Sequence, residues 1–335
     1  MIFPSMMTDK TNHYLIDHSI APSTNSKYSS AFNQFLSYLH KHRLNIDSLS
    51  TRELDSHLVD YIHHLHVLHV PFTTAQYCLS SLIRYTGSRD SFHRSRLALR
   101  GWRRLDARKK RHRPPLTLEV TVLLSVVLLK SNYYAAGVAT LLGFHCYLRI
   151  NEICNLKIRD VVFNGDSRVG TAMSVLATIR LARTKTGENQ AVNVTDQHVA
   201  AVLYDYICSI TNINSIATCR RSLFGFSAAR YRSLFGSAVD ALGLGDVGYT
   251  PHSLRHGGCT RDFMLNVPLL HIQYRGRWRS EASLRTYVNT GTVLLLRTRL
   301  SSELTESAQL FMRHLVTVMR TLAPSQSSSS TRTHR

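Results

Sequence analysis

A short stretch near the C-terminal end constrains the fold and the chemistry of this chain more than any other. Residues 276–287 read GRWRSEASLRTY, which places an indole and a phenol nine positions apart. Upstream, residues 250–258 read TPHSLRHGG, with a histidine three positions before an arginine. These four groups, arranged around a helix start in a very basic chain, indicate chemistry on a phosphodiester with Tyr287 as the nucleophile.

The composition predicts a folded protein with a polyanionic partner. The chain has 335 residues, enough for two domains, and a formal net charge of +20 that favours nucleic acid over a membrane surface. No apolar run approaches the ~20 residues that cross a bilayer, and residues 1–4 do not resemble a signal peptide. We expect an intracellular protein, nuclear in a eukaryotic host and otherwise cytoplasmic.

Cysteine and histidine give no strong sign of a metal or a disulfide. The six cysteines contain no Cys-x-x-Cys pair and are read as buried small apolar residues. Histidines crowd residues 63–69, where His66 and His69 can share one face. Because no cysteine or carboxylate completes a tetrahedral set, exposed or DNA-facing histidines are favoured over a structural zinc site.

The first third of the chain predicts a helical bundle. Residues 1–20 show little periodicity and are expected to be a flexible arm. Residues 21–104 contain four segments with apolar residues at helical spacing. A Ser or Thr at positions 23–24 can cap the first segment, and Ser50 with Glu53 resembles a capping box at the second.

A basic run closed by two prolines is read as a linker between domains over residues 105–115. A solvated helix end is the alternative. If the linker follows a DNA backbone, the candidate contacts are Arg108, Lys109, Lys110, Arg111 and Arg113. The three residues 109–111 also resemble a nuclear import signal, a match that is common by chance.

Residues 116–322 predict a second, mainly helical domain with a small antiparallel sheet. Apolar residues alternate over 175–181, a turn follows at 184–189, and alternation returns at 191–194. Further helices are expected over 195–211, 228–241, 251–265 and 299–322. Residues 323–335 are Ser-rich and are expected to be disordered.

Two elements of this domain carry candidate cations. Arg149 and Glu152 have the i,i+3 spacing that puts a carboxylate beside a guanidinium on one helical face, although an exposed ion pair is the simpler interpretation. Lys185 falls at the tip of the predicted hairpin. There it is either solvated or able to donate a proton to a leaving-group oxygen.

The TPHSLRHGG segment predicts a helix start suited to an anion. Thr250 can cap, Pro251 fits the first helical position, and His252 then lies in the first turn, where free amides and the helix dipole favour negative charge. Arg255 follows one turn later and can bind a phosphate with two donors. A capped surface helix explains this motif in isolation equally well.

In chain order, the candidates resemble the active-site pattern of the tyrosine recombinases, or phage-type integrases: Arg149, Lys185, His252, Arg255, Trp278 and Tyr287. The resemblance implies a mainly α fold with a small antiparallel β-sheet. Residues 21–104 would form a helical core-binding (SAM-like) DNA-binding domain, and residues 116–322 a mixed α+β catalytic domain. The Gly-Arg-Trp at 276–278 is similar to recombinases of eukaryotic mobile elements such as tyrosine-recombinase retrotransposons. The pair Gly257-Gly258 departs from the more frequent Thr of the family.

The resemblance also implies a mechanism. Tyr287 attacks the scissile phosphate, Arg149 and Arg255 bind its nonbridging oxygens, and Lys185 protonates the leaving 5′-oxygen. His252 assists proton transfer, Trp278 packs the site and can donate its indole N–H, and Glu152 supports Arg149. No cofactor and no metal are implied. Double-stranded DNA is the expected partner, with self-association into a synaptic tetramer and a C-terminal segment that docks on a neighbouring protomer.

Two other functions remain open at this point. A type IB topoisomerase-like enzyme would use the same chemistry to relax supercoils instead of exchanging strands. A noncatalytic DNA-binding protein derived from a mobile element would need no reactive tyrosine. The complete set of candidate residues favours an enzyme.

Overall fold

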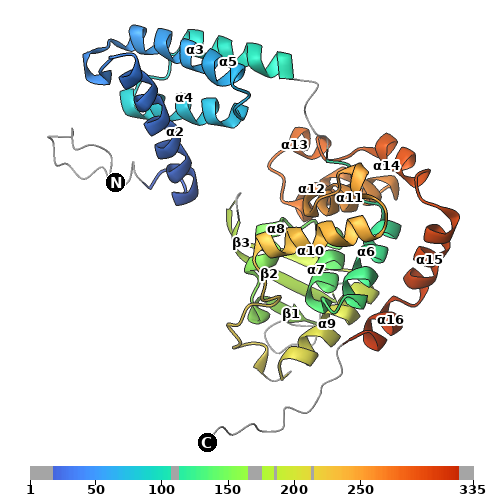
Figure 1. Cartoon of the computed structure of the whole chain (residues 1–335). Coiled ribbons are helices and arrows are strands. Elements are labelled where there is room, and N and C mark those ends of the chain that lie inside the picture. The colour runs from blue at the N-terminus through green and yellow to red at the C-terminus, as the bar shows by residue number, and fades with distance from the viewer. Residues whose placement is uncertain (1–17, 107–112, 165–175, 185–186, 213–214, 324–335) are drawn as a thin grey trace, which may run out of the picture. The chain divides into compact units, whose positions relative to one another are not determined.

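The chain forms two compact units, residues 1–110 and 111–335. The computed structural model describes residues 18–106, 113–164, 176–184, 187–212 and 215–323 (Figure 1). The expected mainly helical fold with a small antiparallel sheet is confirmed. Within these ranges no helix is both long and apolar enough to pass through a membrane.

The N-terminal unit packs helices around one apolar core, within which Phe35, Leu58 and Leu82 are fully buried. The Ser50–Glu53 capping box is present, with the Ser50 amide donating to the carboxylate at 2.8 Å. The Ser or Thr cap expected at residues 23–24 is wrong, because the first helix already begins at Pro22 and has Ala21 as its N-cap. The described helices of this unit are α2 (Pro22–Lys41), η1 (Ile46–Ser48), α3 (Thr51–Val67), α4 (Phe72–Thr86) and α5 (His93–Leu105).

The C-terminal unit is built around two helices that are apolar on nearly every face, α6 (Leu118–Lys130) and α7 (Tyr134–His145). Because such helices must be buried all round, other helices surround them. The other helices in the described part of this unit are α8 (Ile150–Asn155), η3 (Ile158–Asp160), α9 (Gln197–Ile210), α10 (Ala228–Ala241), η5 (Gly245–Val247), α11 (Pro251–Met264), α12 (Leu269–Gly276), α13 (Glu281–Arg285), α14 (Thr290–Arg297), α15 (Ser302–Arg313) and α16 (Leu315–Thr321).

The sheet has the order β1 (Val161–Phe163), β2 (Ala177–Thr184), β3 (Gly187–Val194), and both pairings are antiparallel. Ile179 pairs with Val161 on one side and Val192 on the other, and all three are buried. The alternating pattern therefore predicted the buried face of the sheet. Lys185, between β2 and β3, lies outside the described residues.

One expectation for the C-terminal third was wrong, and three short helices were missed. The helix expected over 299–322 is two helices, α15 and α16, which meet at His314. Helix α15 packs on α6, and α16 packs on α9 and α6, where its Leu315 and Met319 are buried (Figure 1). Because the two helices pack on different surfaces of the same chain, the helix must break between them. Residues 269–297 also form α12, α13 and α14, which are too short to show a clear period.

The glycine pair in α11 allows this helix to pack directly against the backbone of neighbouring segments. A Cβ at Gly257 would overlap the carbonyl oxygen of Leu116, and one at Gly258 would overlap that of Phe144, at the end of α7. Leu116 also donates its amide to the Ser253 carbonyl at 3.1 Å. The departure from Thr at these positions thus sets how closely α11 lies against α7.

We expect Gly258→Ala to lower the free energy of unfolding by about 2 kcal/mol or more, because a rigid backbone carbonyl leaves no room for a methyl group. Gly236→Ala is the matched control within helix α10, since nothing lies within 4 Å of a Cβ there. That change should be neutral or stabilising by up to ~1 kcal/mol. Denaturant unfolding measures both, and equal effects would contradict the close approach.

Candidate active site

Helix α11 carries the buried cation of the site. Arg255 is fully buried at 0% exposure, and its two terminal nitrogens donate to the carbonyl oxygens of Tyr147 and Gly276. Within the described part of the chain, no carboxylate pairs with this guanidinium and its Nε has no hydrogen-bond partner. A buried charge without a counter-ion is costly, so the site favours an added anion.

Burial and the neighbouring arginines lower the pKa of Arg255, and the charge of Glu152 opposes them. Its burial, and then the charges of Arg149 and Arg277, lower the pKa of the guanidinium to about 10. At neutral pH the group therefore still carries its positive charge. Three guanidinium groups near one another, with Glu152 as the carboxylate among them, make the pocket cationic.

Aromatic rings cover Arg255. Its Cζ lies 4.1 Å from the centroid of the Trp278 ring and 5.4 Å from that of Tyr287, distances typical of cation–π contacts. The indole lies against Gly276, where any Cβ would overlap it. The Nε1 of Trp278 is buried and, in the described ranges, has no hydrogen-bond partner. The indole N–H is thus available as a donor.

Tyr287 lies beside two histidines of α11. Its ring stacks on His256 at a centroid distance of 4.4 Å and lies 5.5 Å from His252. Its backbone carbonyl is 3.3 Å from His256 Nδ1 and accepts from the Thr260 hydroxyl at 3.2 Å. The sequence reasoning missed His256 and Thr260, although the i+4 spacing from His252 to His256 to Thr260 was a signal for both.

His252 is half-buried in the first turn of α11. Burial, then the charges of His256, Arg113, Arg255 and Arg149, lower the pKa of its imidazole to about 4. His252 is therefore neutral at pH 7 and can accept a proton.

The start of α11 differs in one detail from the expectation. Thr250 is the N-cap residue and Pro251 the first helical residue, as predicted. The Thr250 hydroxyl, however, makes no capping bond and is buried without a partner in the residues that are described. Instead, the side chain of Ser253 accepts from the Thr250 amide at 3.1 Å.

Arg149 and Glu152 are paired, but not on one helical face as expected. Arg149 has an extended backbone and is the N-cap of α8, while Glu152 lies in the first turn. The carboxylate accepts from the Arg149 amide at 2.8 Å and from its Nη1 at 2.7 Å. The pair forms across a helix start because the chain leaves α7 through Tyr147, whose φ is +49°, and begins α8 only at Ile150.

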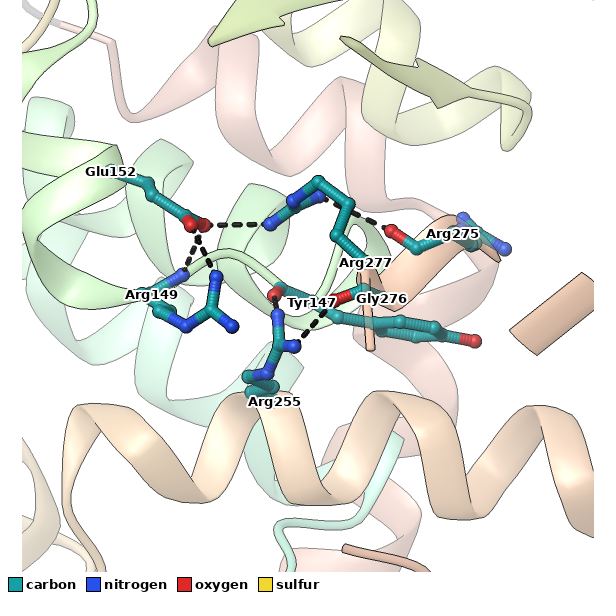
Figure 2. A network of polar contacts seen from close by, with 7 residues as sticks. All are labelled: Tyr147, Arg149, Glu152, Arg255, Arg275, Gly276 and Arg277. Atoms are coloured by element: carbon teal, nitrogen blue, oxygen red, sulfur yellow. Dashed lines mark hydrogen bonds and ion pairs between the residues drawn. The ribbon is translucent and has the colours of Figure 1, made fainter. Parts of the chain in front are cut away.

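A third residue joins this pair. Arg277 donates from Nη2 to Glu152 at 2.7 Å, so one carboxylate holds two arginines (Figure 2). Beside them, the Tyr147 hydroxyl donates to Asp262, which also accepts from Arg275 at 3.0 Å. Nothing local in the sequence indicated these partners, since they come from separate segments of the chain.

The structure brings Arg149, Glu152, His252, Arg255, Trp278 and Tyr287 into one site. Lys185 and the linker residues Arg108, Lys109, Lys110 and Arg111 lie outside the described residues. Arg113 is described and exposed, and its charge acts on His252.

Comparison with known proteins gives a family and a fold. The sequence model of the phage integrase family matches residues 118–292, more than half of the chain. No curated protein sequence matches. Among solved structures, a lambda integrase dimer bound to a core site is 18% identical, with a TM-score of 0.54 over 83% of this chain and 74% of that one.

Two further solved structures share the fold. The Tn1549 transposon integrase in complex with circular intermediate DNA is 18% identical, with a TM-score of 0.54 over 89% of this chain and 96% of that one. The XerH site-specific recombinase bound to its difH substrate is 16% identical, with a TM-score of 0.50 over 78% and 76%.

We expect the imidazole of His252 in the DNA-free protein to stay neutral down to about pH 4. An unfolded chain binds this proton near pH 6.5. Since the unfolded state then binds more protons between these values, folding stability falls as the pH is lowered through this window. NMR titration of the ring protons measures the pKa directly.

His252→Asn should make the loss of stability on acidification shallower. It should not abolish that loss, because burial also lowers the pKa of His145 to about 4. A His252 titration midpoint near pH 6.5 in the folded protein would show the prediction to be wrong.

Proposed function

Because the chain belongs to the phage integrase family, we propose that it is a site-specific DNA recombinase that cleaves and rejoins DNA through Tyr287. The observation that carries the proposal is the Arg255 guanidinium, fully buried beneath the rings of Trp278 and Tyr287. In the described residues it has no carboxylate partner. A scissile phosphate beside Tyr287 supplies the missing negative charge.

The donors around Arg255 suit the nonbridging oxygens of a phosphodiester. Arg149 and Arg255 supply the charge, and Arg255 Nε and Trp278 Nε1 are buried donors without a partner in the described ranges. Donors held in place before the reaction stabilise charge that develops at the phosphate in the transition state. In this proposal Arg149 and Arg255 are the catalytic cations, and Trp278 packs the site and donates its N–H.

The proposed step exchanges one phosphodiester for another. The Tyr287 hydroxyl oxygen bonds to phosphorus, and the bond from phosphorus to the 5′-oxygen breaks, leaving a 3′-phosphotyrosyl link and a free 5′-hydroxyl. The bound phosphate offsets the arginine charges that lower the pKa of His252, so that His252 can accept the phenolic proton. Lys185 gives a proton to the 5′-oxygen. Attack by the 5′-hydroxyl of a second strand reverses the step and rejoins the DNA in a new arrangement.

The partner in this proposal is double-stranded DNA, which the net charge of +20 favours. Exchange between two duplexes cleaves four strands, and we therefore propose a synaptic tetramer with one Tyr287 for each. In a eukaryotic host the protein would act in the nucleus, and otherwise in the cytoplasm. Integration or excision of a mobile element is the proposed use of the reaction.

We expect full-length protein mixed with a nicked suicide substrate to form a covalent protein–DNA adduct, because loss of the short cleaved strand prevents rejoining. The substrate is taken from the DNA that flanks the gene. Tyr287→Phe should abolish the adduct while DNA binding stays within about twofold, since a hydroxyl contributes little to phosphate affinity. Denaturing gel electrophoresis separates the adduct from free DNA.

Tyr274→Phe is the matched control, because Tyr274 is 73% exposed on the neighbouring helix α12. It should form the adduct at the rate of the unaltered protein. An adduct that survives in Tyr287→Phe would sink the proposal. Relaxation of supercoiled DNA without a recombination site would instead point to a topoisomerase-like activity, and DNA binding without any adduct to a noncatalytic protein.

A further inference from the structure

Arg277 occupies a position that its own backbone disfavours. It follows the last residue of α12 with φ 56° and ψ 42°, the left-handed region in which helices usually end on Gly or Asn. Its side chain is only 4% exposed, which is uncommon for arginine. Both features carry a cost, so the side chain must make contacts that offset it.

Those contacts lead directly to Arg149. Arg277 Nη2 donates to Glu152 Oε2 at 2.7 Å, and Arg149 Nη1 donates to Glu152 Oε1 at 2.7 Å (Figure 2). Arg277 Nη1 also donates to the Arg275 carbonyl at 3.2 Å. Because both oxygens accept a hydrogen bond, the carboxylate is held in one orientation. That orientation determines where the Arg149 guanidinium lies.

The charges of this trio explain why a second arginine is useful. Glu152 alone would neutralise Arg149, and a neutralised pair binds a phosphate weakly. When Arg277 shares the same carboxylate, Arg149, Glu152 and Arg277 together keep one net positive charge. The Arg149 side chain is 21% exposed against 4–5% for the other two, so the accessible end of the trio is Arg149.

We propose that Arg277 is a positioning residue for the cleavage reaction: by sharing Glu152 it fixes the Arg149 guanidinium toward the scissile phosphate while leaving Arg149 its charge. The inference rests on the proposed function. Arg277 lies between Gly276 and Trp278, which both contact Arg255, so an indirect structural effect through Arg255 is the competing explanation.

The test uses full-length Arg277→Gln and Arg277→Gly with the nicked suicide substrate, and measures the single-turnover rate of adduct formation at saturating DNA. Both variants should react about 10–100-fold more slowly, the loss expected when a buried charged group loses its partner. Glycine suits the left-handed backbone, so an equal loss in Arg277→Gly traces the effect to the side chain and guards against misfolding. Arg277→Lys keeps a cation near Glu152 and should recover part of the rate.

Arg320→Gln is the matched control. It also removes an arginine that pairs with a carboxylate at 2.7 Å, but on the exposed surface of α16, and its rate should not change. Circular dichroism at the assay temperature verifies that each variant is folded.

A substrate with a neutral methylphosphonate at the scissile position separates positioning from structure. Its phosphorus centre lacks the negative charge that Arg149 would neutralise, so the penalty of Arg277→Gln should shrink to less than about threefold. A penalty that is the same on both substrates would overturn the inference in favour of the structural effect. If the unaltered protein forms the adduct and Arg277→Gln is as fast, the inference fails alone; if the unaltered protein forms none, the proposed function fails.

Discussion

The buried guanidinium of Arg255 is the constraint on which the rest of the site depends. It is satisfied by backbone carbonyls, one from Tyr147 in the turn after α7 and one from Gly276 at the end of α12. Both turns must therefore meet at α11. The glycine pair of α11 makes this possible, since it lets the helix approach the backbone of Leu116 and Phe144. The close packing of α11 and the position of the Arg255 charge therefore depend on each other.

The same site concentrates positive charge at a cost to folding. Arg149, Arg255 and Arg277 lie near one another. Burial, and then the charge of Arg149, lower the pKa of both buried arginines, Arg255 and Arg277. Glu152 offsets part of the repulsion by holding two of them. A fold that leaves this positive charge incompletely compensated is suited to an anionic ligand. The need for such a ligand explains why buried donors in the site have no partner among the described residues.

Features that depend on residues close together in the sequence were predicted well. Features that depend on contacts between separate elements were predicted poorly. Alternation over residues 177–181 predicted the buried face of β2, because side chains of a strand point to opposite faces at every step. The break at His314 escaped prediction, because it depends on where α15 and α16 pack on other helices. The Arg149–Glu152 spacing suggested a helical face, yet the backbone at Arg149 is extended and the contact crosses a helix start.

By itself, the sequence determined the chemistry that the chain can offer: a basic protein, a phenol nine residues after an indole, and a His-x-x-Arg at a helix start. Only the tertiary structure decided which charges meet. Arg277 and Glu152 are 125 positions apart, and no periodic pattern links them. Their contact arises because the start of α8 and the end of α12 lie beside the same buried arginine. Local patterns reflect neighbours along one helix or strand, whereas this ion pair depends on how separate elements pack.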